Sequence, residues 1–93
     1  MSQAPIKDMA VSDRVRRLIY LATYTGMKET DLLLGHFAKT HLPHLSGRDL
    51  DDFEALLTAG DHAIYAWVMG NETVPKAYDT LVFQLIKKFE KQS

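Results

Sequence analysis

Hydrophobic residues recur along most of the chain at the three- and four-residue spacing of one face of an α-helix. The first such stripe predicts a helix that begins at Ser12 and ends near Tyr24–Thr25, just before Gly26, a residue suited to the left-handed conformation that ends helices. Residues 1–11 show no such period, and we predict that they form a flexible N-terminal tail outside a single helical domain of residues 12–91. The apolar residues of this first stripe are Val15, Leu18, Ile19 and Ala22.

A second helix is predicted directly after Gly26, and Pro43 lies just past its end. Because the connection is so short, the first two helices are expected to pack against each other as an antiparallel hairpin. The apolar face of the second helix consists of Leu33, Leu34, Phe37, Ala38 and Leu42.

Start and stop signals predict three further helices in the second half of the chain. Ser46 followed by Asp49 is typical of a helix start, and Gly60 ends that helix. Asp61 can cap a short fourth helix, and the fifth is expected to begin around Pro75, a residue suited to a first helical turn. The apolar positions of these helices are, in order, Leu50, Phe53, Leu56 and Leu57; Ile64, Tyr65, Trp67 and Val68; and Tyr78, Leu81, Val82, Leu85, Ile86 and Phe89.

No window of the sequence alternates polar and apolar residues with the period of a β-strand. We therefore predict an all-α fold, a small five-helix bundle with an antiparallel helical hairpin at its N-terminal end. A chain of 93 residues can fill one core, and 46% hydrophobic residues are too many for a disordered chain. We expect Trp67 and Phe89 to be among the buried aromatic residues.

Charge and composition exclude several functional classes. A net charge of −1 lacks the basic excess of proteins that neutralise nucleic-acid phosphates, and no apolar run approaches the roughly 20 residues that span a bilayer. The chain has no cysteine, which excludes disulfides and thiolate zinc sites. Residues 1–11 resemble neither a signal peptide nor an Arg-rich transit peptide. We expect a bacterial cytoplasmic protein, or a mitochondrial matrix protein if a presequence has been removed.

Four histidines raise the question of a metal site, but their spacing does not favour one. His41 and His44 straddle Pro43 at a helix end, and no HExxH motif is present. No serine occupies a nucleophile elbow. We therefore predict no catalytic residue, no metal and no stably bound cofactor. One helix start carries four carboxylates, which we expect to form a solvated face that suits the helix dipole: Asp49, Asp51, Asp52 and Glu54.

Two blocks of the sequence carry a family resemblance. Gly26 and Glu29 lie at the predicted hairpin turn, and Asp61 and Trp67 lie in a second block before the last helix. With these blocks in this order, residues 14–90 resemble the succinate dehydrogenase assembly factor 2 family, the small flavinylation factors of bacteria and mitochondria. The family's motif at this turn is Arg-Gly-x-x-Glu. Composition alone favours a simpler interpretation of the same residues, in which the glycine permits the turn between two helices and the glutamate interacts with the dipole of the second helix.

Two positions depart from the family's pattern. Thr25 stands where the motif has its arginine, and Ala63 stands where an acidic residue is common. Thr25 cannot supply a guanidinium group to a partner carboxylate. Either that contact is dispensable in this chain, or Arg14, Arg16 or Lys28 supplies the charge.

The resemblance implies an assembly factor that binds the flavoprotein subunit of succinate dehydrogenase, with fumarate reductase as a further candidate client. It would promote covalent attachment of FAD by positioning the client's own site, so the FAD belongs to the partner and the factor is not an enzyme. We expect a monomer. The partner-binding residues that the resemblance implies are Arg17, Thr25, Gly26, Met27, Lys28 and Glu29.

Two other functions remain open from the sequence. The first is a generic helical adaptor or regulatory module that binds an unrelated protein through the same hairpin. The second is an enzyme that uses His36, His41 and His44 with a borrowed metal.

Overall fold

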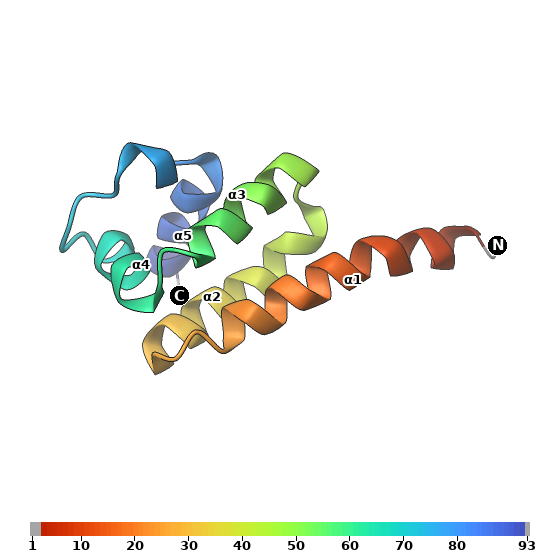
Figure 1. Ribbon diagram of the computed structural model, residues 1–93, viewed down its shortest axis with the longest axis horizontal. Helices are drawn as coiled ribbons and strands as arrows, with labels where there is room; N and C mark the ends of the chain where they lie inside the picture. The colour runs from red at the N-terminus through yellow and green to blue at the C-terminus, as the bar shows by residue number, and fades with distance from the viewer. Residues whose placement is uncertain (1–2, 93) are drawn as a thin grey trace.

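The computed structural model describes the backbone of residues 3–92 and the side chains of residues 13–92. Within this part of the chain there are five α-helices and no strand, which confirms the all-α class (Figure 1). No helix in it is both long and apolar enough to cross a bilayer. The helices are α1 (Gln3–Thr23), α2 (Lys28–His41), α3 (Gly47–Leu57), α4 (Asp61–Val68) and α5 (Leu81–Gln92), with short 3₁₀ turns η1 (Leu42–His44) and η2 (Lys76–Tyr78) before α3 and α5.

The predicted antiparallel hairpin is present. Helices α1 and α2 lie side by side, and the chain reverses between them at residues 24–27 (Figure 1). The helices approach closely at Gly35, where an added Cβ would lie 3.1 Å from Oγ1 of Thr23. A side chain at Gly35 would therefore push the two helices apart.

The start of α1 differs from the prediction. Residues 3–11 were expected to lie in a tail outside the helix, but their backbone continues α1. Pro5 is compatible with this position because the first turn of a helix has no internal partner for its N–H groups. Apolar periodicity in a sequence arises where one face of a helix packs against other elements. Figure 1 shows this end of α1 extending past the other helices, so residues 3–11 need no apolar stripe and the sequence pattern did not indicate a helix there. Residues 1–2 lie outside the described residues, and the division into a tail and a domain at residue 12 stays a prediction.

Aromatic rings from three helices meet in the core. Phe37 of α2 stacks on Phe53 of α3 with 6.0 Å between ring centroids, and Phe89 of α5 meets Phe37 edge-on at 5.7 Å. Trp67 is buried, as expected, and it stacks on Tyr78 at 5.3 Å. Phe89 is only partly buried, which corrects one expectation. The core therefore joins the hairpin to the second half of the chain.

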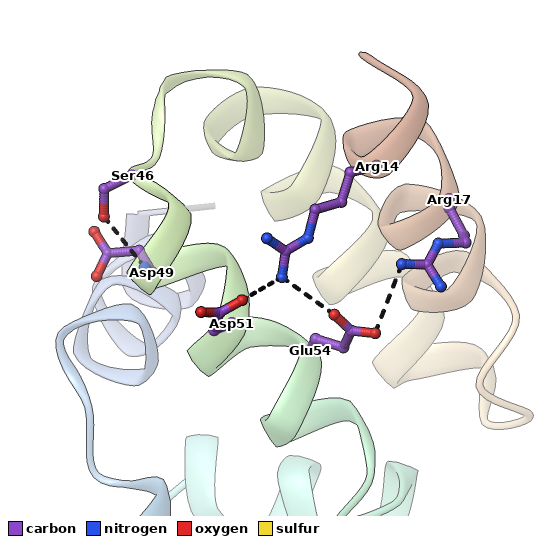
Figure 2. Close-up of polar contacts among 6 residues, drawn as sticks. All are labelled: Arg14, Arg17, Ser46, Asp49, Asp51 and Glu54. Carbon is purple, nitrogen blue, oxygen red and sulfur yellow. Dashed lines mark hydrogen bonds and ion pairs between the residues drawn. The ribbon is translucent and has the colours of Figure 1, made fainter. Parts of the chain in front are cut away.

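The helix starts were predicted with mixed success. Ser46 caps α3 as expected, because its hydroxyl accepts a hydrogen bond from the N–H of Asp49 (Figure 2). Asp61 is not a cap but the first residue of α4. The fifth helix was expected from Pro75 but begins at Leu81, because a 3₁₀ turn follows Pro75 and the chain leaves helical geometry again before Leu81.

The later start of α5 changes its buried face. Leu81 was assigned to the apolar stripe, but its side chain is 63% exposed, whereas Phe83, absent from the stripe, is fully buried. Because α5 starts at Leu81, its inward face is set by Val82, Phe83 and Ile86.

Burial gives a matched pair of stability predictions. Phe53→Ala removes a fully buried ring and should lower the free energy of unfolding by about 3–5 kcal/mol. Leu81→Ala truncates an exposed residue and should change it by no more than about 0.5 kcal/mol. Urea titration followed by circular dichroism measures both values. Equal losses for the two variants would contradict the assignment of the core.

Candidate partner-binding site

The hairpin tip, residues 24–29, is shaped by Gly26. This residue has a φ angle of +120°, a conformation that side chains other than glycine rarely adopt. An added Cβ would also lie 3.1 Å from Oδ2 of Asp61, at the start of α4. Gly26 is thus required both by its backbone angle and by its close neighbour. The two sequence blocks that carried the family resemblance meet at this point.

A second contact ties the same region to α4. Thr30, in the first turn of α2, is fully buried, and its hydroxyl donates a hydrogen bond of 3.3 Å to the carbonyl oxygen of Asp61. Because a buried hydroxyl without a partner would be costly, this bond favours one position of α2 relative to α4.

The side chain of Thr25 is bound within the turn. Its hydroxyl and its backbone N–H both donate to Oδ1 of Asp31, at 2.5 and 2.6 Å. The Thr25 hydroxyl is the main cause that holds the pKa of Asp31 below its usual range, and the backbone N–H groups of Thr25 and Gly26 act in the same direction, against desolvation. Thr25 therefore closes the turn rather than projecting a group toward a partner.

Glu29 points its charge outward. It lies in the first turn of α2, where the helix dipole favours a carboxylate, and its side chain is exposed. No residue whose side chain is described makes a hydrogen bond or ion pair with it. Beside it, Lys28 is likewise exposed and without such a partner in residues 13–92. The tip thus presents one carboxylate and one ammonium group to solvent.

Two of the arginines on α1 are engaged by α3 (Figure 2). Arg14 bonds to Asp51 at 2.5 Å and to Glu54 at 3.2 Å, and Arg17 lies 3.8 Å from the other oxygen of Glu54. Exposed ion pairs of this kind contribute only about 0–1 kcal/mol each. Arg14 is nevertheless directed at α3 and away from the hairpin tip. Two of the acidic residues that were expected to be merely solvated are thus partners of α1.

Arg16 pairs only within α1, at 3.8 Å from Asp13, and both side chains are largely exposed. Of the three cations that could replace the motif arginine, Lys28 is the one at the hairpin tip.

Two grooves flank the hairpin tip. The first, called here the α2–α5 groove, has a volume of about 290 Å³ and is lined by Glu29, Leu32, Leu33, His36, Tyr65, Met69, Phe89 and Glu90. The second is lined by residues of α1, of α3 and of the start of α4, has a volume of about 310 Å³, and includes Thr25 and Asp61 among its lining residues. Concave surfaces next to an exposed turn are suited to contact with a partner.

An exposed aromatic pair next to the tip was missed by the sequence analysis. Tyr20 and Tyr24 are 62% and 67% exposed, and their ring centroids lie 4.8 Å apart at the end of α1. Their spacing of four residues, off the buried stripe, was the available signal. Exposed tyrosines are frequent anchors of protein interfaces, so this pair widens the candidate site.

The histidines do not form a shared site. His41 stacks against Phe37 at 4.8 Å and meets Phe89 edge-on at 5.6 Å, whereas His36 lines the α2–α5 groove. Among the residues whose side chains are described, no three histidine, aspartate or glutamate residues are grouped to hold a metal. The enzyme alternative based on His36, His41 and His44 gains no support from this arrangement.

Comparisons with known proteins identify one family. The family described as "Flavinator of succinate dehydrogenase" matches residues 16–90. "Succinate dehydrogenase assembly factor 2-A, mitochondrial" of Drosophila yakuba is 37% identical over 82 residues, which are 86% of this chain and 51% of that protein. The assembly factor 2 of Candida glabrata is 37% identical over 89 residues (92% and 58%), and that of Dictyostelium discoideum 35% over 72 residues (77% and 51%). The chain therefore spans about half the length of the curated relatives that it matches.

The bond between Thr25 and Asp31 makes a prediction about pH. In the folded protein the pKa of Asp31 is lower than its ordinary value of 3.8. The ionised Asp31 carboxylate therefore contributes to the stability of the fold at pH values above 3.8, and this contribution is lost as the pH falls through the pKa that Asp31 has in the folded protein. Thr25→Val should raise the pKa of Asp31 toward 3.8, and Thr25→Ser, which keeps the hydroxyl, should not. Carboxyl-carbon NMR titration measures this pKa. The same Asp31 pKa in Thr25→Val and the unmodified chain would contradict the assigned role of the hydroxyl.

The absence of a metal stays a prediction. We expect elemental analysis of the purified protein to find no stoichiometric zinc or iron, and a chelator to leave its melting temperature unchanged. A metal content of one per chain would reopen the enzyme alternative.

Proposed function

Because the chain belongs to the family of flavinators of succinate dehydrogenase, we propose that it is an assembly factor that binds the flavoprotein subunit of this enzyme and promotes covalent attachment of FAD. The observation that carries the proposal is the family match over residues 16–90. The relatives are named succinate dehydrogenase assembly factor 2, and the proposal extends that role to this chain.

The factor would act by positioning and not by chemistry of its own. We infer that the covalent bond forms between a histidine of the client and the client's FAD, and that the factor binds a client conformation in which the two are aligned. Such alignment accelerates a reaction because the free energy of binding between factor and client offsets the entropic cost of bringing the histidine and the flavin together. The factor then needs neither a catalytic residue nor a cofactor, and the FAD remains part of the partner.

The hairpin tip is the proposed contact surface. An unpaired carboxylate such as that of Glu29 can accept strong charge-assisted hydrogen bonds from a partner, and Gly26 lets a partner backbone approach closely. Lys28 is best placed to supply the charge of the missing motif arginine, since Arg14 is directed at α3. Thr25 contributes by closing the turn with Asp31. Arg17, 60% exposed and loosely paired with Glu54, and Met27, half-buried, complete the proposed surface.

The finer points of this role are also proposals. We propose that the chain acts as a monomer and that fumarate reductase is a second client. It would act where the client folds, in the bacterial cytoplasm or in the mitochondrial matrix, and the relatives named above are mitochondrial.

Glu29→Ala provides the cleanest test. Loss of a charge-assisted contact at an interface should weaken binding of the client about ten- to a hundredfold, with a matching loss of covalent flavin. The fold should lose only about 0.3–1 kcal/mol of dipole interaction. Each variant is co-expressed with the flavoprotein in a strain that lacks its own factor, and flavin fluorescence of the denatured flavoprotein is read in a gel.

Glu72 provides the control for this test. Glu72→Ala removes another exposed carboxylate, far from the tip in sequence, and should leave covalent flavin unchanged. Gly26→Ala is less informative, because a side chain there is strained and meets Asp61. Full flavin attachment with Glu29→Ala at equal abundance would reduce Glu29 to a helix-start residue. A lack of covalent flavin with the unmodified factor would instead favour the generic adaptor alternative.

A further inference from the structure

The α2–α5 groove combines a hollow with exposed apolar side chains. Leu32 and Met69 at its edge are 58% and 42% exposed, and Leu33 and Phe89 beneath them are partly buried. Helices α2, α4 and α5 contact one another, so the walls of the groove are held by packing. Large apolar side chains exposed beside a hollow are typical of a binding surface.

The charges that line the groove are acidic. Glu29 stands at the end nearest the hairpin tip and is the carboxylate available to an occupant, because Glu90 of α5, which also lines the groove, already takes part in an interaction. Within the described part of the chain, no lysine or arginine lines the groove, and His36 is its one other ionisable side chain besides Tyr65. The groove therefore favours an occupant that carries a positive charge together with apolar surface.

The groove also continues the surface of the hairpin tip. Glu29, Leu32 and His36 recur at helical spacing, so they lie along one face of α2. A partner segment that contacts Glu29 and continues along this face of α2 therefore contacts Leu32 next. The size of the groove, about 290 Å³, is at the lower limit of pockets that hold small ligands, about 300–1,000 Å³, and it suits a side chain better than a dinucleotide.

We propose that the α2–α5 groove receives a segment of the flavoprotein client in which a lysine or arginine adjoins a large apolar side chain. The apolar side chain packs between Leu32 and Met69, and the cation pairs with the carboxylate of Glu29. This inference rests on the proposed function for the identity of the client. To the contact at the hairpin tip it adds a docking contact between α2 and the end of α4.

Two exposed leucines allow a matched test of the apolar contact. Leu32 lies in the groove and Leu81 lies outside it, and their side chains are 58% and 63% exposed. Leu32→Asp should weaken the binding of purified flavoprotein about ten- to a hundredfold, the loss expected when a buried leucine is replaced, whereas Leu81→Asp should leave the Kd unchanged. Isothermal titration calorimetry measures the Kd, and circular dichroism checks that both variants fold. Met69→Gln, a milder change, should also weaken binding and keeps the test valid if Leu32→Asp unfolds.

The pairing of charge and apolar contact is tested by combining variants. If one segment makes both contacts, Glu29→Gln and the uncharged truncation Leu32→Ala together should weaken binding less than the product of the single effects, because losing either contact loosens the other. Glu29→Gln should also reduce the dependence of the Kd on salt, since it removes one half of an ion pair. Single effects that simply multiply would overturn the one-segment arrangement.

The remaining outcomes separate this inference from the proposed function. If the unmodified factor does not bind the flavoprotein, the proposed function fails. If it binds, and Leu32→Asp and Met69→Gln bind equally well, only the groove inference fails. A self-associated factor that Leu32→Asp converts to a monomer would assign the groove to a second copy of the chain and would also overturn the inference.

Discussion

The hairpin tip is held against the first residue of α4, and the candidate site depends on this contact. Gly26 approaches the carboxylate of Asp61 so closely that an added Cβ would lie 3.1 Å away, and the buried hydroxyl of Thr30 bonds to the carbonyl of the same aspartate. Figure 1 shows the tip beside α4, although the two segments are far apart in the sequence. This close approach helps to fix the position of Glu29, at the start of α2, relative to α4, and the α2–α5 groove begins at Glu29.

Three carboxylates surround this contact and have different environments. Asp31 is occupied by the Thr25 hydroxyl and by N–H groups of the turn, and Asp61 accepts a hydrogen bond of 2.7 Å from the N–H of His62. Glu29 alone of the three has no partner among the residues whose side chains are described. Asp31 therefore stabilises the turn, Asp61 bonds within the start of α4, and Glu29 is directed at solvent. This arrangement also explains how a threonine can stand in the place of the motif arginine, because here the position serves to close the turn.

The sequence predicted what depends on local patterns and missed what depends on tertiary contacts. Helical periodicity and the cap at Ser46 are local, and both were confirmed. The start of α5 was wrong because Pro75 is equally suited to the 3₁₀ turn that follows it, and which turn forms is decided by packing. Gly26 and Glu29 were predicted as contact residues only through the family motif, and this stays a prediction. The hydrogen bonds between Thr25 and Asp31 could not be predicted, because they depend on the geometry of the turn between the two residues.

The α2–α5 groove could not be predicted for a similar reason, since its walls come from three helices distant in the sequence. A periodic pattern tells which face of a helix is buried but not which exposed faces lie next to each other. The sequence therefore carried no signal that Leu32 and Met69, exposed residues on different helices, line one groove.

A factor of the proposed kind, which positions its client, would require contacts at fixed separations, and the two proposed contact residues lie on a packed helix. Glu29 and Leu32 lie on one face of α2, whose start is tied to α4 through the buried Thr30 and whose middle is packed on α1 at Gly35. A client that binds both contacts must adopt the spacing that α2 imposes, because moving α2 would break the bond of Thr30 to Asp61. The free energy of binding can then select one client conformation out of several. A flexible loop with the same side chains would bind without making that selection, and this is why the rigidity of the hairpin is itself part of the proposed function.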